Sequence, residues 1–179
     1  MEISYLALLR GVNVGGNNML KMSALALALQ ASGLHNVRTY IQSGNVLFSS
    51  TGTDPAKLEA RIRACIFETY SIDVGVVVFD RTRWQHIIAS APQWWGKNPE
   101  WKHNLLALLP PRTPGEVATA IGELKPGIEM LAPGEGVLYQ SVSFKDFGRA
   151  ATGKLASLPV YKSMTVRNYN TATKLAGLL

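Results

Sequence analysis

At 179 residues, with 47% hydrophobic and 17% charged residues, the chain has the composition of a globular protein with one large domain or two small ones. It lacks both an apolar run of the roughly 18 residues that span a membrane and the features of a signal peptide, so we expect a cytoplasmic protein without a membrane partner. Its single cysteine, Cys65, excludes an internal disulfide. Cys65 lies on an apolar helical face, which predicts an inert core thiol.

The first half of the chain predicts elements in the order β-α-β-β-α-β. We expect strands over 3–10, 37–42, 45–50 and 73–79, and helices over 22–32 and 55–70. Gly33 ends the first helix, and Asp54-Pro55 begins the second with an N-cap and a proline at the first helical position. Ser43-Gly44 is typical of a tight hairpin turn. This order is that of the ferredoxin-like unit, in which the sheet order is 4-1-3-2.

The second half repeats this order with little residue identity. We expect strands over 104–109, 127–132, 136–143 and 164–167, a helix over 114–124, a basic helical segment over 146–158 and a final helix from about Tyr169. The connecting segment 81–103 holds all four tryptophans, which either stack on bases or sugars or, as we favour, join two subdomains. We therefore predict an α+β fold of two ferredoxin-like halves, 1–80 and 104–179, packed together with an extra C-terminal helix.

A glycine- and asparagine-rich loop over residues 10–18 (RGVNVGGNN) follows the first strand. Glycines allow backbone N–H groups to converge on an anion or a polar ligand. In the predicted sheet, this loop meets the turn over residues 42–45 (QSGN). We expect a ligand site that contains Arg10, Asn13, Gly15, Gly16, Asn17, Gln42, Ser43 and Asn45. The alternative is that these residues only build turns, because glycine and asparagine both tolerate positive φ.

A C-terminal segment is the second candidate. Residues 145–179 hold six Lys/Arg against one Asp, a net charge of +5. Asn168 is a plausible N-cap, and the free amides and dipole at a helix start favour an anion. We expect the segment to complete the site with Arg167, Asn168, Thr171 and Lys174. The alternative is an ordinary capped terminal helix.

Several familiar sites are missing from the sequence. Gly11 and Gly16 have the spacing of a P-loop, but Asn17-Asn18 replaces its lysine and hydroxyl residue, which argues against nucleotide hydrolysis of that type. There is no dinucleotide fingerprint or nucleophile elbow, and the three histidines lack metal-site spacing. We therefore expect no metal and no cofactor, and it stays open whether any reaction is catalysed.

Two other functions compete with binding of a small anionic ligand. A nucleic-acid module would use the basic end segments as a phosphate track. Against it, the strands over 3–9, 74–79 and 104–109 are apolar on both faces, which leaves no open face for base stacking. A structural or interaction protein would cover the nearly apolar helix 22–32 with the other half or with a second copy in a homodimer.

Three segments of the chain resemble the bacterial family called domain of unknown function 1697. They are residues 7–16 (ALLRGVNVGG), 40–48 (YIQSGNVLF) and 165–175 (TVRNYNTATKL). The similarity spans essentially the whole chain and implies a cytosolic protein of two ferredoxin-like halves without an assigned activity. Tyr169 stands where an aromatic residue, often tryptophan, is usual in that family.

Overall fold

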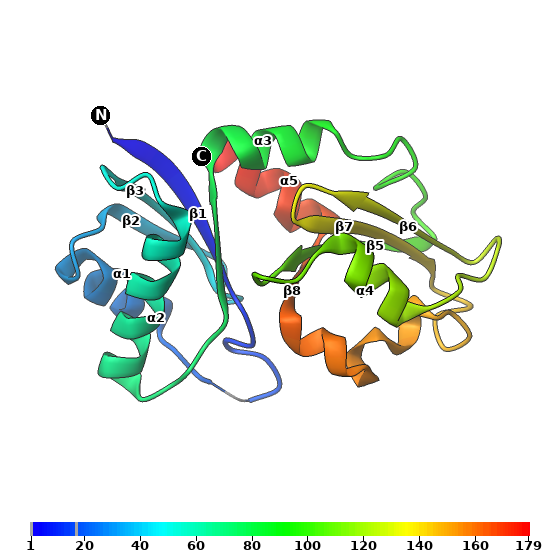
Figure 1. Cartoon of the computed structure of the whole chain (residues 1–179), viewed down its shortest axis with the longest axis horizontal. Helices are drawn as coiled ribbons and strands as arrows, with labels where there is room; N and C mark the ends of the chain where they lie inside the picture. The colour runs from blue at the N-terminus through cyan, green and yellow to red at the C-terminus, as the bar shows by residue number, and fades with distance from the viewer. Residues whose placement is uncertain (1, 17) are drawn as a thin grey trace. The chain divides into compact units, whose positions relative to one another are not determined.

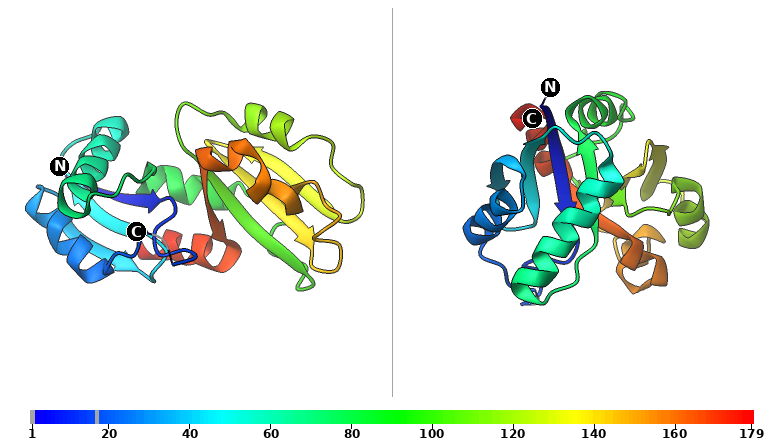
Figure 2. Two further views of the ribbon diagram at one scale, coloured as in Figure 1. Left: turned by 90° about the horizontal axis from the view of Figure 1, so that it is seen from below. Right: turned by 60° about the vertical axis from the view of Figure 1, so that its left-hand side comes forward.

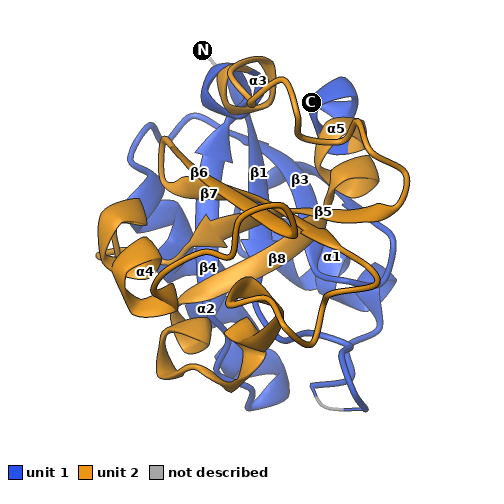
Figure 3. Cartoon of the chain, turned by 90° about the vertical axis from the view of Figure 1, so that its right-hand side faces the viewer, with its two compact units in different colours: residues 1–85, 175–179 blue, residues 86–174 orange. Residues whose placement is uncertain are grey.

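The computed structural model describes residues 2–16 and 18–179 and shows a mixed α+β fold with two four-stranded antiparallel sheets. The chain divides into two compact units (Figure 3). Unit 1 comprises Met1–Gln85 and Leu175–Leu179, and unit 2 comprises His86–Lys174. The segment 81–103, which we predicted as a connection, is thus shared between the units, and the last five residues group with unit 1.

Unit 1 contains the first sheet. Its elements are β1 (Ile3–Leu9), α1 (Met22–Ala31), β2 (His35–Tyr40), β3 (Asn45–Ser50), α2 (Pro55–Tyr70) and β4 (Val76–Asp80), as Figure 1 shows. The strands follow the order β2-β3-β1-β4, which is the predicted order 4-1-3-2. The predicted cap of α2 is present, because Ala56 N donates to Asp54 Oδ1 at 3.0 Å and Pro55 follows the cap.

Helices α1 and α2 cover one face of the first sheet (Figure 1 and Figure 2). The core between them includes Tyr5, Leu25 and Ile62, each at most 1% exposed. Cys65 belongs to the same core and is 8% exposed, as its place on the apolar helical face predicted. This core fixes the end of β1, from which the glycine-rich loop departs.

Helix α1 buries one face only. Met22, Leu25 and Leu29 are buried, whereas Leu27 is 68% exposed. Whether the other half of the chain covers this helix stays a prediction. A homodimer through α1 stays a prediction.

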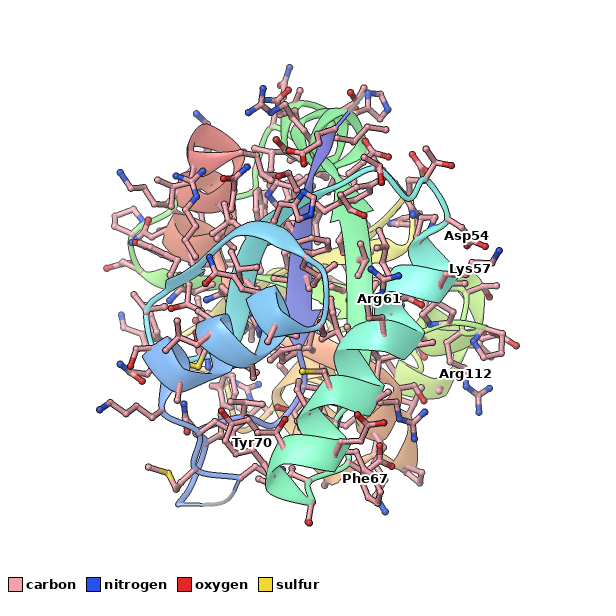
Figure 4. All side chains as sticks on the ribbon, turned by 90° about the vertical axis from the view of Figure 1, so that its left-hand side faces the viewer. Asp54, Lys57, Arg61, Phe67, Tyr70 and Arg112 are labelled. Carbon is pink, nitrogen blue, oxygen red and sulfur yellow. The ribbon has the colours of Figure 1, made fainter. Side chains whose placement is uncertain are left out.

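Helix α2 presents a polar outer side. Figure 4 shows Asp54, Lys57 and Arg61 along it, and Phe67 near its C-terminal end. Lys57 and Phe67 are both exposed. Unit 1 therefore has an exposed lysine and an exposed phenylalanine that can serve as controls for a lysine and phenylalanines of unit 2.

Helix α3 (Arg81–Ala89) begins in unit 1 and ends in unit 2. The second sheet follows in unit 2, with β5 (Trp101–Leu108), α4 (Pro114–Ile121), β6 (Glu129–Gly134), β7 (Val137–Ser143), β8 (Met164–Asn168) and α5 (Tyr169–Leu178). Its strand order, β6-β7-β5-β8, matches that of the first sheet when each sheet is numbered from its own first strand.

The basic helical segment predicted over 146–158 is present only in its second half, and there as a 3-10 helix. The chain forms turns and then two short 3-10 helices, η1 (Thr152–Ser157) and η2 (Pro159–Ser163). Gly148 and Gly153 lower the helix propensity of this segment, and Pro159 cannot continue a helix from the residues before it. The basic side chains therefore lie on an irregular segment instead of along one helical face.

Both sheets have strands that are buried on two faces. Leu6–Leu9 of β1 and Leu105–Leu108 of β5 are buried without interruption. One face of the second sheet packs on α4 and the 3-10 helices through Leu106, Val117 and Leu155. Because successive strand residues point to opposite faces, neither central strand offers an open face for stacking. Within the described residues, no helix combines the length and apolar character that crossing a membrane requires.

Candidate functional site

The glycine-rich loop and the turn over residues 42–45 meet in unit 1, as predicted. Asn13 Nδ2 donates to Gln42 O at 2.8 Å and to Leu20 O at 2.9 Å. Leu20 N donates to Asn13 Oδ1 at 2.7 Å. Both amide hydrogens of Asn13 are engaged by carbonyls, so this side chain fastens the loop to the turn. Asn17 lies outside the described residues.

The turn itself is held by Gly44 and Asn45. Gly44 has φ +73°, and a Cβ there would lie 2.8 Å from Leu9 Cβ, so glycine is required by conformation and by space. Asn45 is fully buried, and its Nδ2 donates to Tyr40 O at 3.0 Å and to Ser43 Oγ at 3.1 Å. Asn13 and Asn45 thus have the contacts that the turn-building alternative expects.

The remaining predicted residues of unit 1 lie nearer the surface. Gly15 and Gly16 are exposed, with φ of +60° and +77°. A Cβ on Gly16 would meet nothing within 4 Å, so the positive φ favours glycine at this position and lack of space does not. Gln42 is exposed and Arg10 is half-buried. Their roles in ligand binding stay a prediction.

The segment 167–174 begins with a capped helix. Thr171 N donates to Asn168 Oδ1 at 2.8 Å, which confirms the predicted cap of α5. Thr171 is buried, whereas Lys174 is exposed. Arg167 is 5% exposed and donates from a terminal nitrogen to Thr165 Oγ1 at 2.7 Å and to Val166 O at 2.8 Å. Burial lowers the pKa of Arg167 to about 10, so its guanidinium is still charged at neutral pH.

The two predicted segments belong to different units. The loop 10–18 and the turn 42–45 lie in unit 1, and Arg167 to Lys174 lie in unit 2. A single site that contains both segments stays a prediction.

Unit 2 contains a cavity of about 570 Å³ where β5 begins, β7 ends and α5 starts. We call it the aromatic cleft; its lining residues are Trp101, Lys102, His103, Phe144, Phe147, Asn168, Tyr169 and Asn170. Phe144 is 59% exposed and Phe147 is 37% exposed. The Lys102 ammonium lies 5.2 Å from the centre of the Phe147 ring. Asn168 is the predicted site residue that lines the cleft.

Glycines position two of the rings of the cleft. Tyr169 packs edge-on against Trp95, with ring centres 4.8 Å apart, and a Cβ on Gly96 would overlap the Tyr169 ring. A Cβ on Gly153 would overlap the Phe147 carbonyl, so this glycine lets the chain around Phe147 approach η1 closely. The sequence interpretation missed Phe144 and Phe147. Two phenylalanines among the charged residues of SFKDFGR were the available signal.

His103 is held in a defined tautomer. Its Nε2 lies 2.8 Å from Asn98 O, a carbonyl that can only accept, so Nε2 carries the proton. Ser141 Oγ can then donate to His103 Nδ1, at 2.6 Å. A serine beside an oriented histidine is the arrangement of an activated nucleophile. Ser141 is only 1% exposed, however, so a substrate does not reach it and the pair instead fixes the His103 ring.

A buried carboxylate joins β6 to η1. Glu129 Oε1 accepts from Lys125 N at 2.8 Å and Ala151 N at 2.9 Å, and Oε2 accepts from Thr152 N at 2.8 Å and Thr152 Oγ1 at 2.7 Å. Burial alone would raise the pKa of Glu129, but these donors together hold it below its ordinary value. Nothing in the amino-acid sequence indicates this role.

The described part of the chain contains no group of three His, Cys, Asp or Glu side chains arranged to hold a metal ion. The aromatic cleft brings together aromatic rings, the Lys102 ammonium group and the start of α5.

Comparisons with known proteins give a family but no activity. The model of a family described as "Protein of unknown function (DUF1697)" matches residues 3–139. No curated protein matches the chain. Among solved structures, the conserved bacterial protein SP0830 from Streptococcus pneumoniae is similar over 99% of both chains, with 25% sequence identity and a TM-score of 0.87.

Proposed function

The chain belongs to DUF1697, a family of unknown function, and we propose that it binds a small, flat, phosphate-bearing ligand such as a nucleotide in the aromatic cleft. The observation that carries this proposal is the presence of two exposed phenylalanines and a lysine in one cavity. Phe144 and Phe147 are both exposed, and Lys102 lies over the Phe147 ring. Exposed rings grouped around a cavity mark binding sites more often than singly scattered ones.

Each part of the cleft has a role that follows from its chemistry. The phenyl rings stack on a flat ligand without selecting one base over another, because every base has a π-face. Lys102 supplies a point charge for a phosphate. The N–H groups of the first turn of α5, near Asn170, favour the same anion through the helix dipole. Binding is proposed here without any reaction.

The test is calorimetric titration of the protein with uridine 5′-monophosphate and ribose 5-phosphate. Phe144→Ala should weaken the binding of the nucleotide about tenfold, because it removes one stacking ring. Lys102→Ala should weaken the binding of both ligands about tenfold, and more at low salt, because it removes a cation.

Matched controls lie on the outer side of α2 in unit 1. Phe67 is 57% exposed and Lys57 is exposed, and both are labelled in Figure 4. Phe67→Ala and Lys57→Ala should leave both affinities within twofold of wild type. Absence of binding at about 1 mM of either ligand, or equal losses in the control variants, would overturn the proposal.

Binding of a single-stranded nucleic acid is the second candidate function of unit 2. Lys145, Arg149 and Lys154 are exposed on the irregular segment that also carries Phe147, so a phosphate track beside the aromatic cleft is available. Anisotropy with a labelled single strand of about ten nucleotides should then show affinity that falls steeply between about 50 and 200 mM salt. A strand that binds much more tightly than the mononucleotide would favour this function.

We also propose that the two units are copies of one ferredoxin-like unit. The matching strand orders of the two sheets support a duplication. An alignment of family members should superpose β1 to β4 on β5 to β8 with inward and outward residues in phase. A register offset by one residue would contradict the duplication, because it reverses every side chain.

A further inference from the structure

The aromatic cleft borders a second, smaller cavity in unit 2. This inner cavity has a volume of about 100 Å³ and shares Lys102 and Phe147 with the cleft. Its polar lining comes from Asn104, Gln140 and Thr152, which are 6%, 2% and 2% exposed. A ligand that stacks on Phe147 therefore lies at the entrance of a buried polar space.

The polar side chains of the inner cavity are fixed in orientation. Asn104 Nδ2 donates to Gln140 Oε1 at 2.8 Å, and Gln140 Nε2 lies 3.4 Å from Thr152 O. Thr152 is itself held by Glu129 through its backbone N–H and its hydroxyl. We call Asn104 and Gln140 the amide pair. Asn104 Oδ1 takes no part in the hydrogen bond between these two side chains, and the hydrogen bond from Gln140 Nε2 to Thr152 O is long. The pair thus offers an acceptor and a donor for the edge of a ligand.

The amide pair is unusual for its surroundings. The same face of the second sheet carries Leu106, Leu138 and Met164, which form the apolar core of the unit. Two apolar side chains would fill this position without the need to satisfy buried polar atoms. A polar ligand edge gives the amides a role that packing alone does not.

The volume limits what enters. At about 100 Å³, the inner cavity is smaller than the roughly 150 Å³ apolar cavity that takes up one benzene ring in another protein, so it has room for one six-membered ring but not for the fused rings of a purine. Pyrimidine bases present adjacent donors and acceptors on their edges. We propose that the inner cavity is the base-recognition subsite of the aromatic cleft and selects pyrimidine nucleotides, an inference that rests on the proposed function.

The test compares four ligands on the full chain: uridine and cytidine 5′-monophosphates, adenosine 5′-monophosphate and ribose 5-phosphate. Wild-type protein should bind at least one pyrimidine nucleotide about tenfold more tightly than either adenosine monophosphate or ribose 5-phosphate. The double variant Asn104→Leu/Gln140→Leu replaces both partners of the amide pair with apolar groups, a change that can be nearly neutral for folding. It should lose the pyrimidine preference and keep its affinity for ribose 5-phosphate within twofold.

A second variant removes space instead of hydrogen bonds. Ala156 lines the inner cavity and is absent from the lining of the aromatic cleft. Ala156→Met should reduce pyrimidine affinity to that of ribose 5-phosphate, with thermal unfolding as the check on folding. Wild-type binding without preference among bases, or an unchanged preference in both variants, would overturn this inference and leave the proposed function intact. Failure of every ligand to bind wild type would overturn both.

Discussion

In unit 1, Asn13 of the loop 10–18 and Asn45 of the turn 42–45 bond to backbone groups, whereas in unit 2 aromatic and amide side chains line two adjoining cavities. Asn13 and Asn45 use their amides to close turns. Asn104 and Gln140 use theirs beside a cavity that opens toward Phe147. Amide side chains thus stabilise turns in unit 1 and line a cavity in unit 2. Only their hydrogen-bond partners distinguish the two roles.

The largest effect should come from the buried carboxylate of unit 2. Glu129→Ala removes an acceptor of four hydrogen bonds and leaves buried donors unpaired, so the free energy of unfolding should fall by about 4 kcal/mol, measured by urea denaturation. Glu123→Ala, at an exposed position of the same unit, should change it by less than about 0.5 kcal/mol.

The contribution of Glu129 should depend on pH. Its pKa in the folded protein is lowered, so the unfolded chain binds the proton more readily and the stabilisation is fully present above the ordinary value of 4.5. It should be lost as the pH falls through the folded pKa. A difference between wild type and Glu129→Ala that grows toward low pH would contradict the role assigned to this carboxylate.

Alanine substitution at two glycines of unit 1 distinguishes the effect of steric overlap on stability from the effect of a positive φ. Gly44→Ala places a Cβ 2.8 Å from Leu9 Cβ at φ +73°, and should destabilise the protein by about 3 kcal/mol. Gly16→Ala meets no neighbouring atom at φ +77°, and should cost only the backbone strain of about 1 kcal/mol. Thermal unfolding of the two variants measures the difference. Equal losses would mean that the turn at Gly44 does not approach Leu9, at the end of β1, as closely as described.

Asn13→Ala tests whether the glycine-rich loop binds a ligand or only holds the turn. It removes three hydrogen bonds and places alanine at φ +55°, so stability should fall by about 2 kcal/mol. The affinity for uridine 5′-monophosphate should stay within twofold of wild type in the same calorimetric titration. A loss of affinity with stability preserved would instead favour the predicted ligand site in the loop.

The smallest effect should come from Cys65. Cys65→Ala removes one buried sulfur from the core of unit 1 and should lower the free energy of unfolding by about 1 kcal/mol. The thiol should react with a disulfide reagent only as the protein unfolds. Rapid modification of the native protein would contradict its placement in the core.

The sequence predicted best those features that depend on neighbouring residues. Asp54-Pro55 and Asn168 cap helices within three residues of themselves, so their roles can be read locally. The strand order of unit 1 follows from the succession of its elements. The meeting of loop and turn then follows from that order, although the carbonyl of Gln42 that Asn13 bonds lies 29 residues away.

The aromatic cleft could not be predicted in the same way. Apolar residues such as Phe144 and Phe147 usually indicate a core, and only packing decides which ones remain exposed. Glu129 resembles any surface glutamate in the sequence, since its four donors come from segments before and after it in the chain. No α-helix forms over 146–158, where we predicted a helical segment, because two glycines and the proline that follows outweigh its basic, partly apolar pattern.

The chain order of the units has a consequence for biosynthesis. Leu175–Leu179 belong to unit 1, where Arg38 donates to the Leu178 carbonyl, but they are synthesised after the whole of unit 2. At the usual rate of translation, this delay is on the order of ten seconds. Unit 1 is therefore complete only after unit 2 has been synthesised, because Leu175–Leu179 follow unit 2 in the chain.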